Sequence, residues 1–310
     1  MCQSQGKELL DNDKMSPSSP DAITPHGEYG TIPIRRRTPE GGSSRLKPAL
    51  VRTAPRGLTI VQDSHVGRVR QHNEDAWLTL DLSYQENDGQ TMIALLILAD
   101  GMGGHADGDL ASTLAVRTAA ACVMQDAILP YLSPEVVGAQ RYSLHETLVR
   151  AVQVANEAVY RSLPDAGTTL TMALVLKQKA YLAHVGDSRA YLLENGNLRR
   201  ITRDHSLAAR LVETGQTTPE EMLGHRNILY RAVGHSSTIE VDTHTESFVD
   251  GSCLLLCSDG LWAKMSDSEI AKVLMSESDA QSAVGKLITV ANERGGEDNI
   301  TLILAVCNEG

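Results

Sequence analysis

The sequence predicts an α+β layered sandwich on three observations. Short runs of aliphatic and β-branched residues recur from residue 58 to residue 306, and each is long enough for one strand. Neighbouring runs are joined by tight turns such as Glu194-Asn195-Gly196-Asn197, and short links of this kind favour antiparallel hairpins over parallel crossovers. The groups follow one another as strands, then helices, then more strands, an order typical of α+β proteins.

The first 56 residues are predicted to be a disordered, proline-rich tail with a basic end. They hold seven of the eleven prolines, one aromatic residue, Tyr29, and nine Lys/Arg against six Asp/Glu. Such a composition buries too little apolar surface to offset the conformational entropy of the chain. Two interpretations stay open: a docking or regulatory arm for an acidic partner, or a plain solvated segment. Residues 57–308 are predicted to form one folded domain without internal repeats.

The first half of that domain contains two strands and two helices. Strands are predicted at about 58–63 and 91–99, and the second of these is almost entirely aliphatic. An alanine-rich segment at about 108–124 is predicted to be a helix. A second, amphipathic helix is predicted at about 143–162, because apolar residues recur there at helical spacing, at Leu144, Leu148, Val152, Ala155 and Val159.

The second half returns to strands before it ends with two more helices and a last strand. The strands are predicted at about 168–177, 180–185, 188–193, 239–245 and 252–258. A capping box, Ser266-Asp267-Ser268-Glu269, begins the third helix. The fourth helix covers about 279–293 and ends before Gly295-Gly296, and the last strand follows at about 299–306.

Composition and charge exclude several classes of protein. With 42% hydrophobic and 22% charged residues, the 310-residue chain has the composition of a soluble globular protein. Its longest apolar run, Met92 to Ala99, is far shorter than the roughly 20 residues that span a bilayer, and its N-terminus lacks the apolar core of a secretory signal. We therefore expect a cytoplasmic protein without a membrane partner. Five cysteines without metal-binding spacing are interpreted as core thiols. The net charge of −14 on residues 57–310 argues against a nucleic-acid partner.

Aspartates stand at the ends of several predicted strands. Asp100 and Asp259 each follow an apolar run and precede a glycine. Asp187 follows another strand, and Asp298 comes just before the last one. In an antiparallel sheet the end of one strand lies at the same edge as the start of its neighbour, about 4.8 Å away. These carboxylates can therefore meet at one edge, close enough to bridge two metal ions about 3.5–4 Å apart.

The ligand types point to hard divalent cations. A cluster of carboxylates repels itself unless cations neutralise it, and an all-oxygen set favours Mg²⁺ or Mn²⁺ over zinc. Glycine beside Asp100 and Asp259 also lets a backbone carbonyl approach an ion. An Asp-Gly pair after a strand is by itself most often a turn, and the spacing alone leaves that alternative open.

Seven short motifs follow one another along the chain: Gly67-Arg68-Val69-Arg70-Gln71-His72-Asn73-Glu74-Asp75, Asp100-Gly101-Met102-Gly103-Gly104-His105, Gly167-Thr168-Thr169, Gly186-Asp187-Ser188-Arg189, Thr202-Arg203-Asp204-His205-Ser206, Ser258-Asp259-Gly260-Leu261 and Asp298-Asn299-Ile300-Thr301. In these motifs the chain resembles the metal-dependent protein phosphatases, the type 2C Ser/Thr phosphatases, in their bacterial form. Each match is weak alone, but seven in the family's order, over nearly all of residues 60–306, are specific.

The resemblance implies a four-layer α-β-β-α sandwich of two antiparallel sheets flanked by helices, with metals in a cleft between the sheets. It makes residues 57–308 a metal-dependent phosphatase domain. The implied cofactors are Mn²⁺ or Mg²⁺, as two core ions with a place for a third. By position, Asp100 would bridge the core ions, Gly101 would bind one through its carbonyl, and Glu74 would reach that ion through water.

The remaining ligands follow in the same way. Asp259 and Asp298 would hold the other core ion, and Asp187 with Asp259 would hold the third, weaker one. Arg70 matches the phosphate-binding arginine of the family, and its planar fork suits a phosphoryl group.

Three departures and one open role accompany the match. Met102 stands where animal members carry a histidine proposed as general acid, so His105 becomes the candidate proton donor, with a metal-bound water as the alternative. Asp109 replaces the usual glutamate, the segment 220–227 is shorter than the usual flap, and the tail lies outside the family pattern.

The implied function is a protein Ser/Thr phosphatase that hydrolyses phosphoserine and phosphothreonine by a metal-activated water, without a phosphoenzyme. Its expected partners are phosphorylated protein substrates and a cognate Ser/Thr kinase in signalling, and its expected state is a monomer. One alternative is a catalytically inactive family member that only binds phosphoproteins. Another, a metal-dependent nuclease or phosphodiesterase, is disfavoured by the acidic charge of the folded part.

Overall fold

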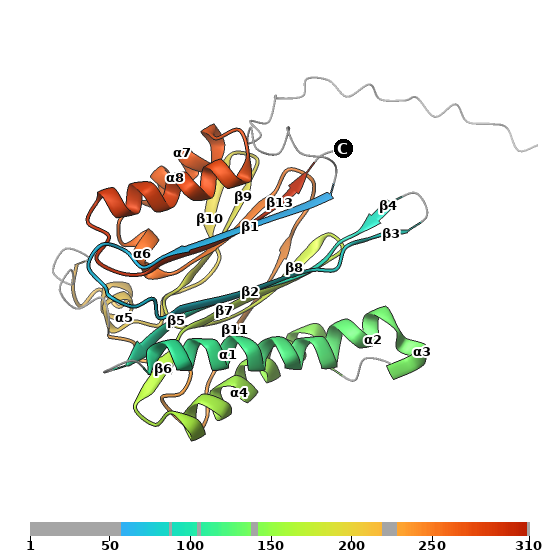
Figure 1. The fold of residues 1–310 in the computed structure, drawn as a ribbon, viewed down its shortest axis with the longest axis horizontal. Coiled ribbons are helices and arrows are strands. Elements are labelled where there is room, and N and C mark those ends of the chain that lie inside the picture. The colour runs from blue at the N-terminus through green and yellow to red at the C-terminus, as the bar shows by residue number, and fades with distance from the viewer. Residues whose placement is uncertain (1–56, 87–88, 104–106, 138–141, 219–227, 309–310) are drawn as a thin grey trace, which may run out of the picture. The chain divides into compact units, whose positions relative to one another are not determined.

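Two antiparallel sheets lie between two layers of helices in the computed structural model, which describes residues 57–86, 89–103, 107–137, 142–218 and 228–308 (Figure 1). The four-layer α-β-β-α prediction is therefore confirmed. The tail, the segment 220–227 and His105 lie outside the described residues. Among the helices that are described, none combines the length and the apolar character needed to cross a membrane.

The first sheet is covered by the C-terminal helices α7 (Asp267–Ser276) and α8 (Ala280–Glu293). Its strands lie in the order β1 (Gly57–His65), β13 (Ile300–Asn308), β12 (Cys253–Cys257), β9 (Arg189–Glu194) and β10 (Asn197–Arg200). All four contacts between these neighbours are antiparallel.

The second sheet packs against α1 (Gly108–Val123) and α4 (Leu144–Ser162). Its strands lie in the order β11 (Asp242–Ser247), β8 (Lys179–Val185), β7 (Leu170–Leu176), β5 (Ile93–Gly103) and β2 (Asp75–Asp81), and β6 (Ala166–Thr168) pairs with the end of β5. The shorter elements are the hairpin β3 (Tyr84–Glu86) and β4 (Gly89–Thr91), the π-helix η2 (Met124–Ile128), α2 (Leu129–Leu132), α3 (Pro134–Val137), α5 (Leu207–Glu213) and α6 (Asp259–Trp262).

The central strands are apolar throughout because both of their faces are buried. In β5, Leu95 and Ile97 pack toward α1 and α4, whereas Leu96 and Leu98 pack toward the first sheet. β12 alternates in the same way between the core under α7 and α8 and the core between the sheets. Strands buried on both faces read as continuous hydrophobic runs, which is why the sequence predicts them well.

All four predicted helices are present near their predicted bounds. Capping boxes begin two of them: Ser143 with Glu146 at α4, and Ser266 with Glu269 at α7. Each box satisfies backbone N–H groups that would otherwise lack a partner at the start of the helix.

The strand predicted at 168–177 is present, but it is divided at Thr169 into β6 and β7, which pair with β5 in one continuous register. There the Thr169 N–H donates to the carbonyl of Asp100, which lies opposite it in this register, whereas the Asp100 N–H donates to the Thr169 side chain at Oγ1; both distances are 2.9 Å. The strands β2 and β10 and the helices α5 and α6 were not predicted. β2 alternates between apolar and polar residues, and β10, Asn197–Arg200, is a short polar edge strand.

Candidate metal centre

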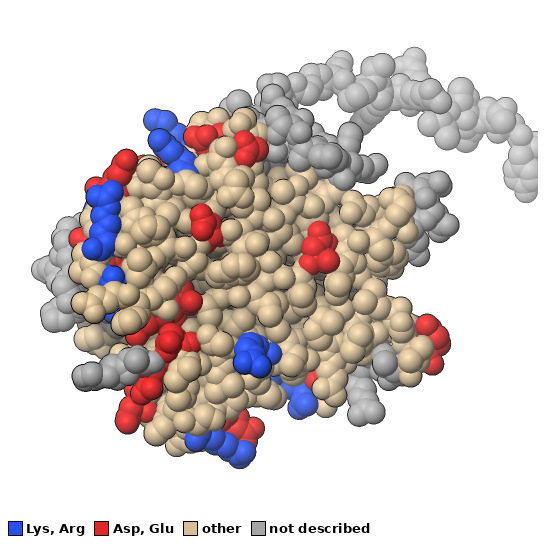
Figure 2. All heavy atoms as spheres, in the orientation of Figure 1, with Lys and Arg blue, Asp and Glu red and all other residues tan. Residues whose placement is uncertain are grey.

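One cleft at the end of the two sheets contains every predicted site residue that the structure describes. Its volume is about 200 Å³, and it is lined by Arg70, Glu74, Asp100, Gly101, Met102, Gly103, Thr169, Asp187, Leu229, Asp259 and Asp298. Figure 2 shows acidic side chains gathered at the end of the visible face where, in Figure 1, β5 ends and β2 begins. His105, the candidate proton donor, lies outside the described residues.

Asp100 lies near the end of β5 with its backbone tightly fixed. Its N–H donates to Oγ1 of Thr169 over 2.9 Å, and its carbonyl accepts from the Thr169 N–H at the same distance. Across the sheet it stands opposite Asp75 of β2. In the described parts of the chain no hydrogen-bond donor reaches the Asp100 carboxylate, so this group stays available to a ligand in the cleft.

Glu74 and Gly101 come together because β2 and β5 are neighbours. The Gly101 N–H donates to the Glu74 carbonyl over 3.1 Å, and the Ser112 hydroxyl of α1 donates to the same carbonyl over 2.6 Å. A Cβ at Gly101 would overlap the carbonyl oxygen of Gly108. Only glycine therefore allows the start of α1 to pack this closely against the cleft.

Asp259 and Asp298 enter the cleft from the first sheet. Asp259 is the first residue of α6, two residues after the end of β12, and Asp298 lies two residues before β13. Beside Asp298, the Asn299 amide donates to two carbonyls of the segment before β2, those of Val66 and His72, both at 3.0 Å. Its side-chain oxygen accepts from the Glu74 N–H over 2.8 Å. Asn299 therefore holds candidate ligands from the two sheets together.

Asp187 occupies the short loop between β8 and β9, so it links the two sheets. Gly186 in this loop has a φ of 109°, a conformation that L-residues with side chains rarely adopt. A Cβ there would meet the Cγ2 atom of Thr169 at 2.5 Å. The glycine thus lets the loop pass close to Thr169 and brings Asp187 to the cleft.

Arg70 lies at the mouth of the cleft with its side chain 46% exposed. Its Nη2 atom donates to Asp298 over 2.8 Å, and Nη1 is 3.9 Å from the Glu74 carboxylate. A guanidinium in this position neutralises part of the acidic cluster and can also receive an anionic substrate group.

Burial and mutual repulsion raise the pKa values of the clustered carboxyls. The pKa of Asp100 is well above its ordinary range, first through burial and then through Asp75 and Asp259. The pKa of Asp259 is also raised, first by burial and then by the charge of Asp187. Burial, then Asp204, raises the pKa of Asp187 to about 7. Ionising these groups together is costly, and bound cations would offset that cost.

The residues present fit a hard divalent cation. Every candidate ligand offers oxygen, which Mg²⁺ and Mn²⁺ prefer. Gly101 lines the cleft without a side chain, and Oδ1 of the buried Asp75 carboxylate has no hydrogen-bond partner among the described residues. In the described ranges, no three Asp, Glu, His or Cys side chains are arranged closely enough to hold one metal ion. Side-chain rotamers adjust far more readily than the fixed backbone when a cation binds.

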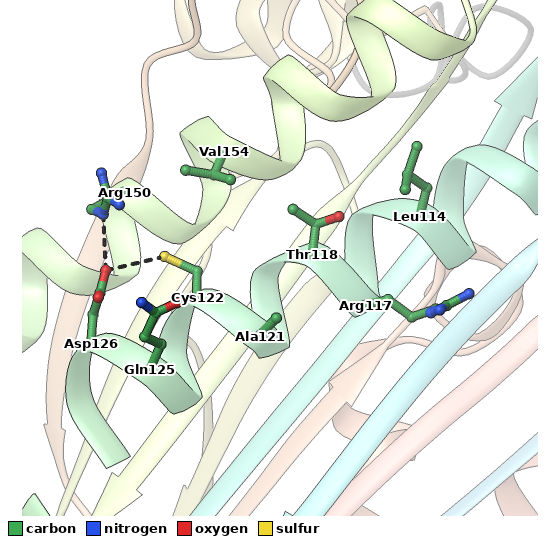
Figure 3. A pocket seen from close by; sticks show the side chains of 9 residues that line it. All are labelled: Leu114, Arg117, Thr118, Ala121, Cys122, Gln125, Asp126, Arg150 and Val154. Atoms are coloured by element: carbon green, nitrogen blue, oxygen red, sulfur yellow. Dashed lines mark hydrogen bonds and ion pairs between the residues drawn. The ribbon is translucent and has the colours of Figure 1, made fainter. Parts of the chain in front are cut away.

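A second hollow, between α1 and α4, lacks this chemistry (Figure 3). It is larger, at about 490 Å³, but Asp126 is the only carboxylate among the residues that line it. That carboxylate pairs with Nε of Arg150 at 2.9 Å and lies 3.6 Å from the Cys122 thiol. The size of a cavity therefore does not identify the site here, whereas the convergence of acidic residues does.

Some residues of the site were not singled out by sequence reasoning. Asn299 and Asp75 stand inside the quoted motifs, but their contacts join segments up to 233 positions apart. Asp75 accepts a hydrogen bond from Ser258, which precedes Asp259, over 2.9 Å. The only sequence signal for either residue was its position beside a predicted ligand.

Comparison with known proteins agrees with this geometry. The family described as "Protein phosphatase 2C" matches residues 61–304. The chain is 38% identical over 244 residues to the serine/threonine phosphatase stp of Listeria welshimeri, covering 78% of this chain and 93% of that protein. It is 35% identical over 251 residues to the protein phosphatase PhpP of Streptococcus pneumoniae, covering 79% and 95%.

Solved structures of similar proteins share the fold. The serine/threonine phosphatase PstP/Ppp of Mycobacterium tuberculosis superposes with a TM-score of 0.66 at 34% identity, covering 81% of this chain and 99% of that one. A structure of the PstP catalytic domain in complex with two manganese ions gives a TM-score of 0.65 at 33% identity, covering 81% and 99%.

Proposed function

The chain belongs to the protein phosphatase 2C family and is a metal-dependent protein serine/threonine phosphatase, and we propose that the cleft lined by Asp100, Asp259 and Asp298 is its active site. One observation carries this proposal: five acidic residues from separate parts of the chain line a single cleft together with an arginine. As part of the same proposal, residues 57–308 act as one phosphatase domain.

The metal ligands are assigned from the residues that line this cleft. Glu74, Asp100 and the Gly101 carbonyl would hold one core ion, and Asp259 and Asp298 would complete a second that shares Asp100. Asp187 and Asp259 would hold a third. When bound, Mn²⁺ or Mg²⁺ supplies a water of lowered pKa and stabilises the negative charge that develops at phosphorus.

The chain's own groups bind and orient the substrate. Arg70 is exposed enough to accept a phosphoryl group, and two parallel N–H donors of its guanidinium match two phosphoryl oxygens. A phosphoserine or phosphothreonine dianion would draw Arg70 away from Asp298, which frees that carboxylate for its ligand role. His105 is assigned to protonate the leaving serine or threonine oxygen.

The finer partners are part of the same proposal. Phosphorylated proteins are the substrates, a cognate Ser/Thr kinase supplies them, and the chain acts as a monomer in the cytoplasm. Free thiols at Cys122, Cys253 and Cys257 are compatible with a reducing compartment.

Release of phosphate from a phosphothreonine peptide tests the proposal. We expect turnover in Mn²⁺, none in EDTA, and a loss of at least about 100-fold in Asp259→Asn, because one ligand of the ion cluster is removed. Asp81→Asn is the matched control, since Asp81 is exposed at the far end of β2 from Asp75.

Turnover that is equal in EDTA and Mn²⁺ would refute the metal mechanism. Metal-dependent binding of the peptide without release of phosphate would instead identify an inactive phosphoprotein-binding family member.

A further inference from the structure

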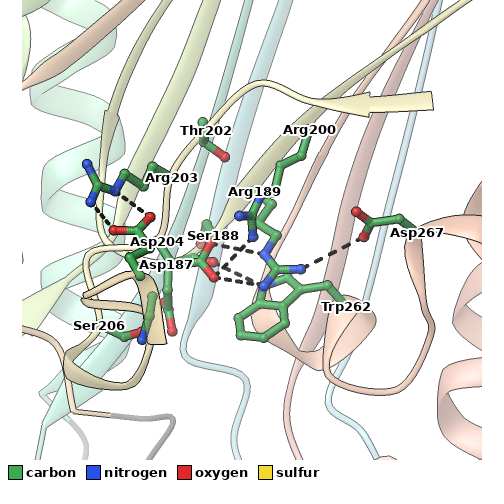
Figure 4. A network of polar contacts seen from close by, with 12 residues as sticks. Asp187, Ser188, Arg189, Arg200, Thr202, Arg203, Asp204, Ser206, Trp262 and Asp267 are labelled. Atoms are coloured by element: carbon green, nitrogen blue, oxygen red, sulfur yellow. Dashed lines mark hydrogen bonds and ion pairs between the residues drawn. The ribbon is translucent and has the colours of Figure 1, made fainter. Parts of the chain in front are cut away.

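A stacked network of side chains lies behind the Asp187 loop (Figure 4). Nε1 of Trp262 donates to the Asp187 carbonyl over 3.0 Å. The Arg189 guanidinium lies over the Trp262 indole, 3.7 Å from the ring centroid. Asp204 orients that guanidinium by accepting hydrogen bonds from Nε at 3.0 Å and from Nη2 at 2.7 Å.

This network connects two of the proposed ligands. Trp262 is the last residue of the short helix α6, and Asp259 is its first. The indole that holds the Asp187 backbone therefore belongs to the same helical turn as the Asp259 carboxylate. The hydrogen bond of Trp262 therefore joins the loop that carries Asp187 to the helical turn that carries Asp259.

The other side of the loop is held by the residue next to Asp204. The His205 N–H donates to the Gly186 carbonyl over 2.8 Å, and the Gly186 N–H donates to Nδ1 of His205 over 3.1 Å. Two consecutive residues, Asp204 and His205, thus hold the loop at both Gly186 and Arg189. The loop backbone is fixed on both sides of Asp187, so its carboxylate is presented from a rigid support.

The desolvation cost of this network indicates a role beyond packing. The side chains of Arg189 and Asp204 are only 14% and 7% exposed, and burying such a pair carries a desolvation penalty that apolar side chains would avoid. The planar guanidinium of Arg189 stacks on an aromatic face while a carboxylate holds its N–H groups, and an apolar side chain offers no such combination. This arrangement fixes the plane of the Trp262 indole and thus the direction of its N–H.

We propose that Trp262, held in plane by Arg189, is a positioning residue that sets the spacing of Asp187 and Asp259 and so the affinity of the ion they share. The inference rests on the proposed function for the kind of ligand, a divalent cation. Trp262 and Arg189 are absent from the residues that line the cleft, so their effect would be exerted through Asp187 and Asp259.

Calorimetric titration of the full-length chain with Mn²⁺ tests this inference. Asp187→Asn should remove one binding step, which identifies the Asp187–Asp259 ion. Trp262→Phe keeps an aromatic ring under Arg189 but deletes the N–H donor, and should weaken that same step about 10- to 100-fold. The tighter binding and the kcat at saturating Mn²⁺ should stay as in the wild type.

A matched control is available because the chain has only one other tryptophan. Trp77→Phe on β2, where the side chain is 39% exposed, should leave the whole isotherm unchanged. Arg189→Lys keeps the charge but loses the flat face, and should weaken the same step as Trp262→Phe. It also provides the test if Trp262→Phe does not fold, which thermal melting would show.

Isotherms of Trp262→Phe or Arg189→Lys that match the wild type would overturn the inference, as would an unchanged isotherm in Asp187→Asn. The experiments separate this inference from the proposed function. If Asp259→Asn abolishes turnover while Trp262→Phe changes no binding step, the positioning role is wrong and the phosphatase site stands.

Discussion

Arg70 illustrates how one side chain would serve two states of the proposed site. Without substrate it pairs with Asp298 at 2.8 Å, although its side chain is 46% exposed. An exposed ion pair of this kind contributes little to stability, on the order of 0–1 kcal/mol, so it can be exchanged for a phosphoryl group at small cost. In the proposed site, the residue type at this position is explained by substrate binding rather than by folding.

Arg70→Ala should therefore lower kcat/KM about 10- to 100-fold, because a charged hydrogen bond to substrate contributes roughly 1.5–3 kcal/mol. Mn²⁺ affinity should be unchanged or slightly higher, since the mutation removes a competitor for Asp298. Steady-state kinetics and a Mn²⁺ titration would measure both, with Arg68→Ala as a nearby control. A large loss of Mn²⁺ binding would contradict this assignment.

The end of β5 shows how a strand places backbone and carboxylate together. Gly101 and Gly103 are two positions apart on this strand, but their surroundings differ. A Cβ at Gly101 would overlap Gly108 at the start of α1, whereas a Cβ at Gly103 would make only ordinary contacts, 3.5 Å from Cβ of Ala166. Of these two glycines, only Gly101 is required for the close approach of α1 to β5.

Gly101→Ala should destabilise the protein by about 1–3 kcal/mol through this overlap and should weaken Mn²⁺ binding as Asp100 shifts. Gly103→Ala should change the free energy of unfolding by less than about 0.5 kcal/mol. Chemical denaturation of both variants compares them directly. Equal losses in the two variants would mean that the packing at Gly101 is not the constraint inferred here.

Strands differ in how well the sequence predicts them, for a physical reason. β5 and β12 are buried on both faces and read as unbroken apolar runs. β2 turns only Ala76, Leu78 and Leu80 toward a core. It therefore has no long unbroken apolar run, and it was not predicted. The break between β6 and β7 could not be predicted, because it depends on hydrogen bonds between Thr169 and Asp100.

Across the folded part as a whole, buried polar groups tie stability to pH. His184 of β8 is fully buried between two partners, the Thr171 hydroxyl at 2.9 Å and the Arg203 carbonyl at 3.0 Å. The carbonyl can only accept, so Nε2 carries the proton and Nδ1 accepts from Thr171. Burial, and then the neighbouring His205, lowers the pKa of His184 to about 3.

Acid should therefore destabilise the protein through this residue. The unfolded chain binds a proton at His184 below about pH 6.5, while the folded chain does not until about pH 3, so its contribution is complete above pH 6.5 and is lost as the pH falls. Between pH 7 and pH 5 we expect a loss of about 2 kcal/mol that is absent in His184→Gln. Urea denaturation at both pH values measures it, with the exposed His235→Gln as control. An identical pH dependence in wild type and His184→Gln would contradict it.

The candidate site was predictable in part. Glu74, Asp100, Gly101, Asp187, Asp259 and Asp298 were named from strand ends and from the family resemblance, and all six line the cleft. The supports of these ligands were not predicted, because Asn299 and Trp262 act through contacts with segments more than 70 positions away. Such contacts leave no pattern in the local sequence.

The central claim is that these acidic side chains converge on shared cations. A crystal of the chain grown with saturating Mn²⁺, measured at the manganese absorption edge, tests it most directly. We expect two strong anomalous peaks in the cleft bounded by Asp100, Asp259 and Asp298, and a weaker one between Asp187 and Asp259. Peaks located only elsewhere on the protein, or a cleft without any, would contradict the account.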